Sequence, residues 1–134
     1  MTSEESTAPA SRASGAARAY AIGIRLLLLV VVAQFLLAGL GVFADSSFFF
    51  WHAAIGSSAV LVLSLLLVGI GRLGGVPGRT LWLTAAVAGL VLVQSLLLVP
   101  YHMAVPTVVR TVSGLHVVNA LLIFWIVVRL FERT

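Results

Sequence analysis

The stretch Phe48–Gly56, FFFWHAAIG, places a histidine just inside the start of a long apolar run that continues to about Ile70. An ionisable side chain within a bilayer is costly and uncommon, so His52 marks a candidate functional position. A second histidine, His116, lies in the last apolar run of the chain, in the stretch GLHVVNA. The two histidines therefore point to a site inside a membrane-embedded fold.

The composition around these runs is typical of a membrane protein. Of the 134 residues, 61% are hydrophobic and only 9% are charged, whereas a soluble domain carries roughly 25% charged residues. We therefore expect the lipid bilayer to be the solvent. The formal charge is +4, but the arginines flank apolar runs singly and form no basic stripe, which argues against nucleic acid as a partner. The chain has no cysteine, so disulfides and thiolate ligands are excluded.

Four apolar runs are each close to the ~20 residues that cross ~30 Å of hydrocarbon as a helix. The polar turn at residues 45–47 can cap the helix that follows it, and a Gly/Pro-rich loop separates the second run from the third. The connections are short, so neighbouring helices should be antiparallel. We predict an all-α integral membrane four-helix bundle over residues 20–134, with helices at about 20–44, 48–70, 80–99 and 107–130.

The first 19 residues are rich in Ser, Ala, Thr and Gly and show no apolar periodicity. Residues 1–19 are therefore predicted to be a disordered cytoplasmic tail. A cleavable signal peptide is the alternative, with a small-residue cleavage site at residues 42–44. We favour a retained helix, because the first apolar run is longer than the usual signal-peptide core of about 7–15 residues.

The arginines predict the orientation of the bundle. Seven of the eight lie before or just inside the start of the first helix, between the second and third helices, or at the end of the fourth helix, and these positions share one end of the bundle. The eighth, Arg110, lies near the opposite end. Because arginines accumulate on the cytoplasmic side of membrane proteins, we predict a multi-pass protein of the cell membrane with both termini in the cytoplasm.

His52 and His116 lie on the second and fourth helices, which should run in the same direction and be diagonal in a simple bundle. Their depths from the outer end are ~8–10 Å and ~14–15 Å at 1.5 Å per residue, a gap that helix tilt can close. Two imidazoles that face each other across such a core can hold a haem iron as axial ligands. The sequence therefore predicts haem b as a cofactor, with His52 and His116 as the iron ligands.

Small residues near both histidines leave room for a ring system. Gly56 follows His52 at i+4, and Ala120 follows His116 at i+4 on the same helix face. Asn119 shares the face of His116 and is a candidate hydrogen-bond partner for a ligand imidazole.

Other polar residues in the outer half of the predicted bundle can be interpreted in more than one way. Arg110 can pair with a haem propionate, or its side chain can reach lipid phosphate. Gln34 and Gln94 are expected mainly to hydrogen-bond between helices. His102 lies beside a proline in the outer loop and is expected to be solvated.

The positions of His52 and His116, 64 residues apart (116 − 52), resemble one half of the haem A synthase family. Each four-helix half in that family carries one histidine near the outer start of its second helix and one in its fourth. The stretch LHVVNALLIF also resembles a group of small four-helix bacterial membrane proteins of unknown function, and the likeness covers about residues 24–129. The resemblance implies haem binding rather than haem oxidation, because Phe49 stands where the modifying half of the synthase has a glutamate.

The sequence leaves three functions open. The leading hypothesis is a b-type haem protein for electron transfer or haem handling near the outer face, as a homodimer or as a subunit of a larger membrane complex, with no catalytic residue predicted. The second is a cofactor-free structural or accessory protein whose polar residues only join helices. The third is a carrier of a small apolar or quinone-like molecule. Zinc is disfavoured because no Asp, Glu or Cys accompanies the two histidines as a third ligand.

Overall fold

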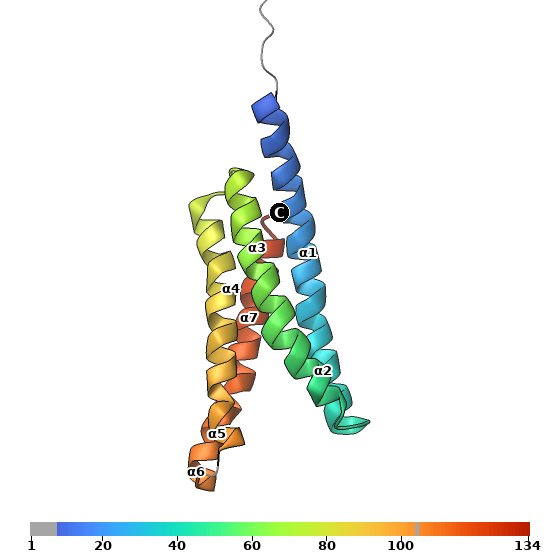
Figure 1. Ribbon diagram of the computed structural model, residues 1–134, viewed down its shortest axis with the longest axis vertical. Coiled ribbons are helices and arrows are strands. Elements are labelled where there is room, and N and C mark those ends of the chain that lie inside the picture. Colours follow the sequence, from blue (N-terminus) through green and yellow to red (C-terminus); the bar gives the residue numbers. More distant parts are fainter. Residues whose placement is uncertain (1–7, 104) are drawn as a thin grey trace, which may run out of the picture.

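The computed structural model describes residues 8–103 and 105–134, and these contain helices and turns with no strand (Figure 1). The chain forms α1 (Ala8–Phe43), α2 (Phe48–Ala54), the π-helical segment η1 (Ile55–Ala59), α3 (Val60–Leu73), α4 (Gly78–Leu97), α5 (Val99–His102), α6 (Thr107–Arg110), the 3-10 segment η2 (Thr111–Gly114) and α7 (Leu115–Phe131). The segments α2, η1 and α3 form one continuous second helix, and α6, η2 and α7 form the fourth. The predicted all-α fold with four helices long and apolar enough to cross a membrane is confirmed.

The first helix begins earlier than the sequence suggested. α1 starts at Ala8 rather than near residue 20, so residues 8–19 continue the helix instead of forming part of a disordered tail. Six of these twelve residues are alanine, which has the highest helix propensity, and extending a helix that already exists needs no new nucleation. Residues 1–7 of the predicted tail lie outside the described residues.

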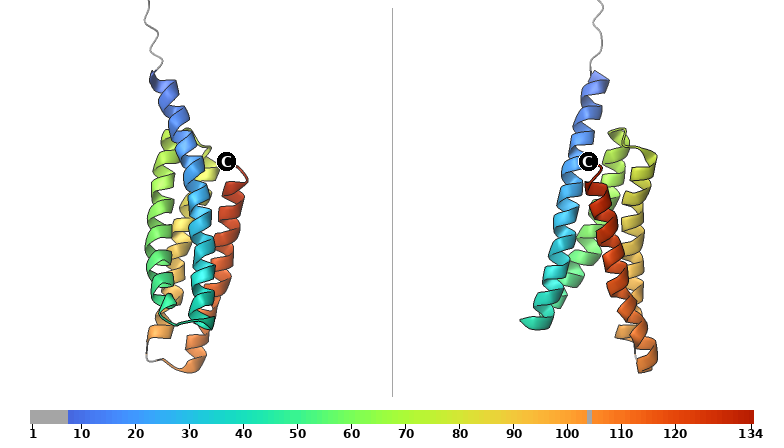
Figure 2. Two further views of the ribbon diagram at one scale, coloured as in Figure 1. Left: turned by 90° about the vertical axis from the view of Figure 1, so that its right-hand side faces the viewer. Right: turned by 180° about the vertical axis from the view of Figure 1, so that it is seen from behind.

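The direction of the chain alternates along the bundle. In Figure 1, α1 runs down the view, α2 and α3 run back up, α4 runs down, and α7 runs up to the C-terminus. Figure 2 shows the same four helices from two further sides. α3 packs against α1 and α4, and α7 also packs against α1 and α4, while the described backbones of α3 and α7 stay farther apart. The second and fourth helices are therefore diagonal across the bundle.

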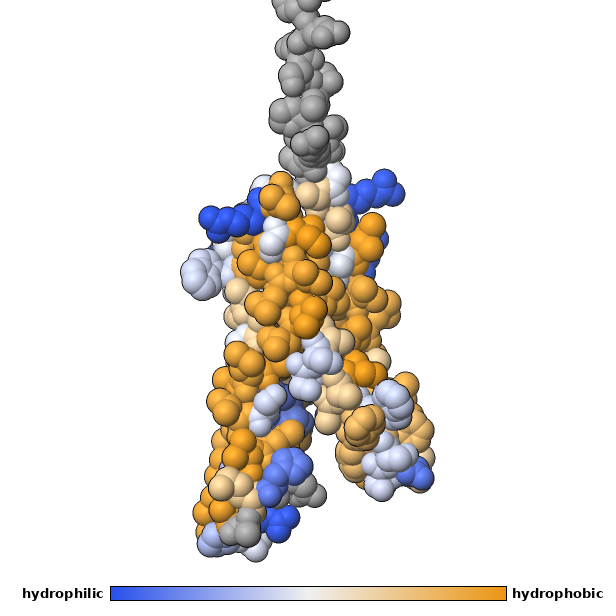
Figure 3. Space-filling model, in the orientation of Figure 1, coloured by the Kyte–Doolittle hydropathy of each residue, from blue (hydrophilic) through white to orange (hydrophobic). Residues whose placement is uncertain are grey.

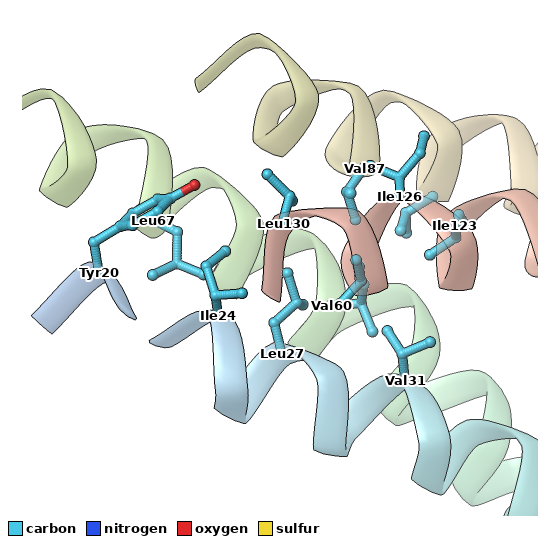
Figure 4. Packing of buried hydrophobic residues seen from close by; sticks show 12 residues of the cluster. Tyr20, Ile24, Leu27, Val31, Val60, Leu67, Val87, Ile123, Ile126 and Leu130 are labelled. Carbon is cyan, nitrogen blue, oxygen red and sulfur yellow. The ribbon is translucent and has the colours of Figure 1, made fainter. Parts of the chain in front are cut away.

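A packed core closes the end of the bundle that carries the α3–α4 turn (Figure 4). α1 contributes buried residues that are three or four positions apart and so lie on one face of the helix, and α3, α4 and α7 contribute the residues that pack against them. The fully buried hydrophobic members are Tyr20, Ile24, Leu27, Leu67, Val87, Val127 and Leu130. This end, which we call the closed end, holds the four helices together.

A buried hydrogen bond joins α1 to the diagonal helix α4 within this core. The hydroxyl oxygens of Tyr20 and Thr84 are 2.7 Å apart. Thr84 gives its own hydroxyl hydrogen to the carbonyl oxygen of Thr80 at 3.0 Å, so the Tyr20 hydroxyl is the donor to Thr84. The pairing satisfies two polar groups that would otherwise be costly in an apolar interior.

The opposite end of the bundle is divided. The ends of α1 and α2 form one limb, and the end of α4 with α5, α6 and η2 forms a second limb (Figures 1 and 2). The space-filling view shows a gap between the two limbs, with hydrophilic residues along it, below a predominantly hydrophobic surface (Figure 3). We call this the open end.

The turn at the tip of the first limb is the polar segment predicted between the first two helices. The backbone N–H of Ser47 donates to Oδ1 of Asp45 at 2.7 Å, and this bond lowers the pKa of the Asp45 carboxyl. The Ser47 side chain makes no capping bond to α2. The first N–H groups of α2 bond instead to the backbone carbonyls of residues 45–47.

Gly74, at the end of α3, allows a close approach to α1. A Cβ at this position would lie 2.6 Å from the backbone nitrogen of Ala17, and backbone atoms cannot move aside as a flexible side chain can. Gly74→Ala is therefore expected to lower the free energy of unfolding by roughly 1–3 kcal/mol. Thermal unfolding in detergent, followed by circular dichroism, measures the effect.

Gly69→Ala is the matched control for this change, because a Cβ at Gly69 of the same helix would meet nothing within 4 Å. It should unfold at or slightly above the wild-type temperature, since alanine favours a helix more than glycine does. Equal unfolding temperatures for the two variants would contradict the close contact at Gly74.

Candidate functional site

A cavity of about 390 Å³ lies between the two limbs and is bordered by all four long helices. Most of its wall is apolar, as expected for a small-molecule site. The polar side chains in the wall come from every long helix, and they are Gln34, His52, Ser57, Gln94, Ser95, His102 and His116. The open end therefore gathers most of the polar residues that the sequence placed in that half of the helices.

The π-helical segment η1 turns His52 toward this cavity. The buried face of α3 includes Val60, Ser64 and Leu67. His52 lies eight residues before Val60, and in an uninterrupted α-helix it would point about 80° away from that face. A π turn adds one residue to the helix, and this reduces the offset to about 20°. The irregular turn thus aligns the imidazole with the interior of the bundle.

Two serines support the irregular turn. The hydroxyl groups of Ser57 and Ser58 donate to the backbone carbonyls of Ala53 and Ala54, four residues earlier in each case. Serine hydroxyls commonly make such bonds and bend or perturb the helix there. Local chemistry in the sequence GSS is thus consistent with a departure from α-helical geometry.

His52 is held by the backbone of α1. Its Nδ1 lies 2.9 Å from the carbonyl oxygen of Gln34. Because a carbonyl oxygen only accepts hydrogen bonds, Nδ1 must carry the hydrogen, and Nε2 then carries the lone pair. A histidine that donates one ring N–H to a backbone carbonyl is oriented in the way typical of metal-binding histidines.

His116 is held differently, by a chain of side-chain amides. Asn119 donates to the carbonyl oxygen of Leu90 at 2.9 Å and to Oε1 of Gln94. Since Oε1 of Gln94 is the acceptor there, its Nε2 is the donor to Nε2 of His116, 3.1 Å away. His116 Nδ1 is buried and, among the described residues, has no hydrogen-bond partner.

The two imidazoles lie close together in an edge-to-face arrangement. Their ring centroids are 6.1 Å apart, and the ring planes are inclined at 65°. Two metal–nitrogen bonds of about 2 Å, with about 1 Å from each nitrogen to its ring centre, would place the centroids about 6 Å apart around one shared metal. An inclination between the ring planes is compatible with this arrangement, because both planes can contain the axis through the metal.

Gln34 contributes a buried amide with unused hydrogen-bonding capacity. Its side chain is only 9% exposed, and within the described residues neither Nε2 nor Oε1 has a hydrogen-bond partner. It packs against Gly56, where an added Cβ would lie 2.8 Å from Gln34 Oε1. A buried unpaired amide is costly unless something fills its bonds, so Gln34 is suited to contact a ligand in the cavity.

The other predicted site residues differ in whether they line the cavity. Gly56 lines the cavity, whereas Asn119 is buried behind the wall and orients Gln94. Arg110 is exposed at the end of α6 and is not part of the cavity wall. His102, expected to be solvated, is exposed but also borders the cavity.

Sequence reasoning missed two contributions to the site. The backbone carbonyl of Gln34, which orients His52, carries no signal in the amino-acid pattern. Gln94 was expected to join helices, and it does so, but through His116 itself. In the described part of the chain no three His, Cys, Asp or Glu side chains are grouped as ligands for a metal ion, so a metal here would depend on the histidine pair.

Comparison with known proteins gives one family. A family of unknown function, DUF6220, matches residues 34–104, which is more than half of the chain. The chain belongs to this family. The segment that matches DUF6220 begins at Gln34 and includes His52, Gly56 and Gln94, while His116 lies beyond it. No match was found among curated proteins or among solved structures.

Proposed function

We propose that this DUF6220 protein is a haem-binding membrane protein in which His52 and His116 are the axial ligands of a b-type haem. The observation that carries the proposal is the proximity of two imidazoles from diagonal helices, with ring centroids 6.1 Å apart, in the wall of one cavity. A bound haem would supply one-electron redox chemistry, tuned by its ligands and by burial. The chain would orient it and shield it from water.

The remaining features of the cavity support this choice over a bare metal ion. The wall is mainly apolar, which suits a macrocycle, and the gap between the limbs leaves a side through which its polar edge could reach solvent (Figure 3). A bare ion would need further ligands that the pair does not have. The spacing of the two histidines resembles that of one half of the haem A synthase family, and it points to the same cofactor.

The arginines support an outward-facing site. Arg72 and Arg79 flank the α3–α4 turn at the closed end, and Arg129 and Arg133 lie at the end of the fourth helix beside it. From the positive-inside rule we propose that the closed end and both termini are in the cytoplasm and that the cavity is toward the outer face of the cell membrane. Exposed Arg110 lies at the open end, where it is suited to pair with a propionate.

In that position the protein would carry out electron transfer or haem handling, as a homodimer or within a larger membrane complex. Expression of the full chain with ample haem, followed by purification in mild detergent, tests the proposal. We expect a Soret band, an α-band on reduction and one haem per chain. A colourless preparation that takes up no added haem would overturn the proposal.

A second candidate is a carrier of a small apolar or quinone-like molecule, and the Gln34 amide favours it. A ligand carbonyl or hydroxyl could complete the hydrogen bonds that this buried side chain lacks. Mass spectrometry of extracts from the colourless protein separates the two candidates. A carrier should retain a defined apolar compound in the wild type, and Gln34→Leu should release it.

A further inference from the structure

We infer that the two axial histidines have unequal roles: His52 is the permanent ligand, and His116 is an exchangeable one that can yield its place to a small lone-pair donor such as carbon monoxide, nitric oxide or imidazole. This inference rests on the proposed haem function and extends it to a second ligand class. It follows from the different hydrogen bonds that the two rings make.

His52 is fixed in a state ready to bind a metal. Its Nδ1–H donates to the carbonyl of Gln34, a backbone atom within the long helix α1 that cannot turn away. The bond keeps the ring orientation and leaves the Nε2 lone pair available. Among the described residues, no hydrogen bond to this nitrogen has to break before it binds iron.

His116 is in the opposite state. Its Nε2 lone pair already accepts a hydrogen bond from Gln94, and Asn119 holds the Gln94 amide in the orientation that makes this donation possible. The Leu90 carbonyl in turn holds Asn119. Binding of iron through Nε2 therefore requires His116 to leave a preformed partner.

A small rotation is enough for this exchange. Turning the imidazole about its Cβ–Cγ bond moves both ring nitrogens but leaves the ring centre nearly in place. The centroid spacing of 6.1 Å is thus compatible with His116 bound to Gln94 and with His116 bound to iron. One neutral hydrogen bond shifts such an equilibrium by about threefold to tenfold, so its loss should move His116 toward the iron by that factor.

The surroundings of His116 favour its release. The residue is the second of α7, and the segment before this helix is η2, a 3-10 segment whose hydrogen bonds are less favourable than those of an α-helix. The cavity beside it is open between the limbs (Figure 3), which gives a small molecule a route to the iron. Ser113 Oγ, in the same segment, is buried without a hydrogen-bond partner among the described residues. The polar groups beside His116 are therefore not all satisfied by the protein itself.

The test is the rate of carbon monoxide binding to the reduced, haem-loaded full chain in lipid nanodiscs. Gln94→Leu removes the competing partner, so His116 should stay on the iron and the rate should fall about threefold to tenfold. His116→Ala should retain haem and bind carbon monoxide faster than the wild type. Leu92→Ala, at an exposed position of the same helix, is the control and should match the wild type.

A second readout does not need haem. In the haem-free protein with ¹⁵N-labelled histidine, Gln94→Leu should shift the Nε2 resonance of His116 and leave that of His52 unchanged. Wild-type protein that binds no haem would count against the proposed function itself. Haem-loaded protein with the same carbon monoxide rate in wild type and Gln94→Leu, or with as little haem in His116→Ala as in His52→Ala, would overturn only the unequal roles.

Discussion

Replacing His52 with alanine is expected to reduce the haem content of the purified protein at least tenfold, and added imidazole is expected to restore it. His52 offers the only imidazole of the pair whose Nε2 lone pair is not already hydrogen-bonded. Its loss should therefore remove more than the ~1.4 kcal/mol that corresponds to a tenfold change in binding. Free imidazole can occupy the space left by the side chain and supply the missing nitrogen. The measurement is the ratio of Soret absorbance to protein.

His102→Ala is the control for this prediction. His102 borders the same cavity but is not one of the two proposed ligands, so its removal should leave the haem content unchanged. If His52→Ala kept its full haem content, or if His102→Ala lost as much haem as His52→Ala, the assignment of His52 as a ligand would be wrong.

Replacing Gly56 with leucine is expected to exclude haem without touching either histidine. A Cβ on Gly56 would already lie 2.8 Å from Gln34 Oε1, and a longer side chain would extend into the cavity that both residues line. We expect haem content to fall at least tenfold, because the macrocycle and the new side chain cannot share the space. Haem stoichiometry is the measurement, and circular dichroism reports whether the helical fold persists.

Gly69→Leu provides the matched control for Gly56→Leu. Gly69 lies on the same continuous helix, is exposed, and has open space around the position of an added Cβ. The same substitution there should leave both haem content and helicity unchanged. A Gly56→Leu protein with a full complement of haem would show that the cavity does not hold it.

The architecture follows from signals that are strong in the sequence. The four apolar runs have the length of a membrane-crossing helix, and the Gly/Pro-rich segment between the second and third cannot continue a helix. Short connections limit the possible arrangements, and the observed packing makes the second and fourth helices diagonal. The expectation that His52 and His116 lie in one space used only the arrangement predicted from these short connections and the positions of the two residues along their helices.

The local geometry of the site could not be read in the same way. The π-helical turn lies where η1 packs against α1 and α4, and its residues, Ile55–Ala59, would also fit an ordinary helix. The division of the open end into two limbs likewise depends on the volumes of many side chains. The early start of α1 was missed because apolar periodicity was the criterion, and an alanine-rich segment can be helical without it.

The one-residue insertion at Ile55–Ala59 gives the second helix two rotational settings. The part that follows it is fixed by packing at the closed end, and the part that precedes it is fixed by the bond between His52 and α1. Ordinary α-helical geometry over the same residues would keep the packing of α3 at the closed end but turn the imidazole about 100° around the helix axis, away from the interior of the bundle. Whatever the two imidazoles bind, their alignment depends on this one irregular turn of the second helix.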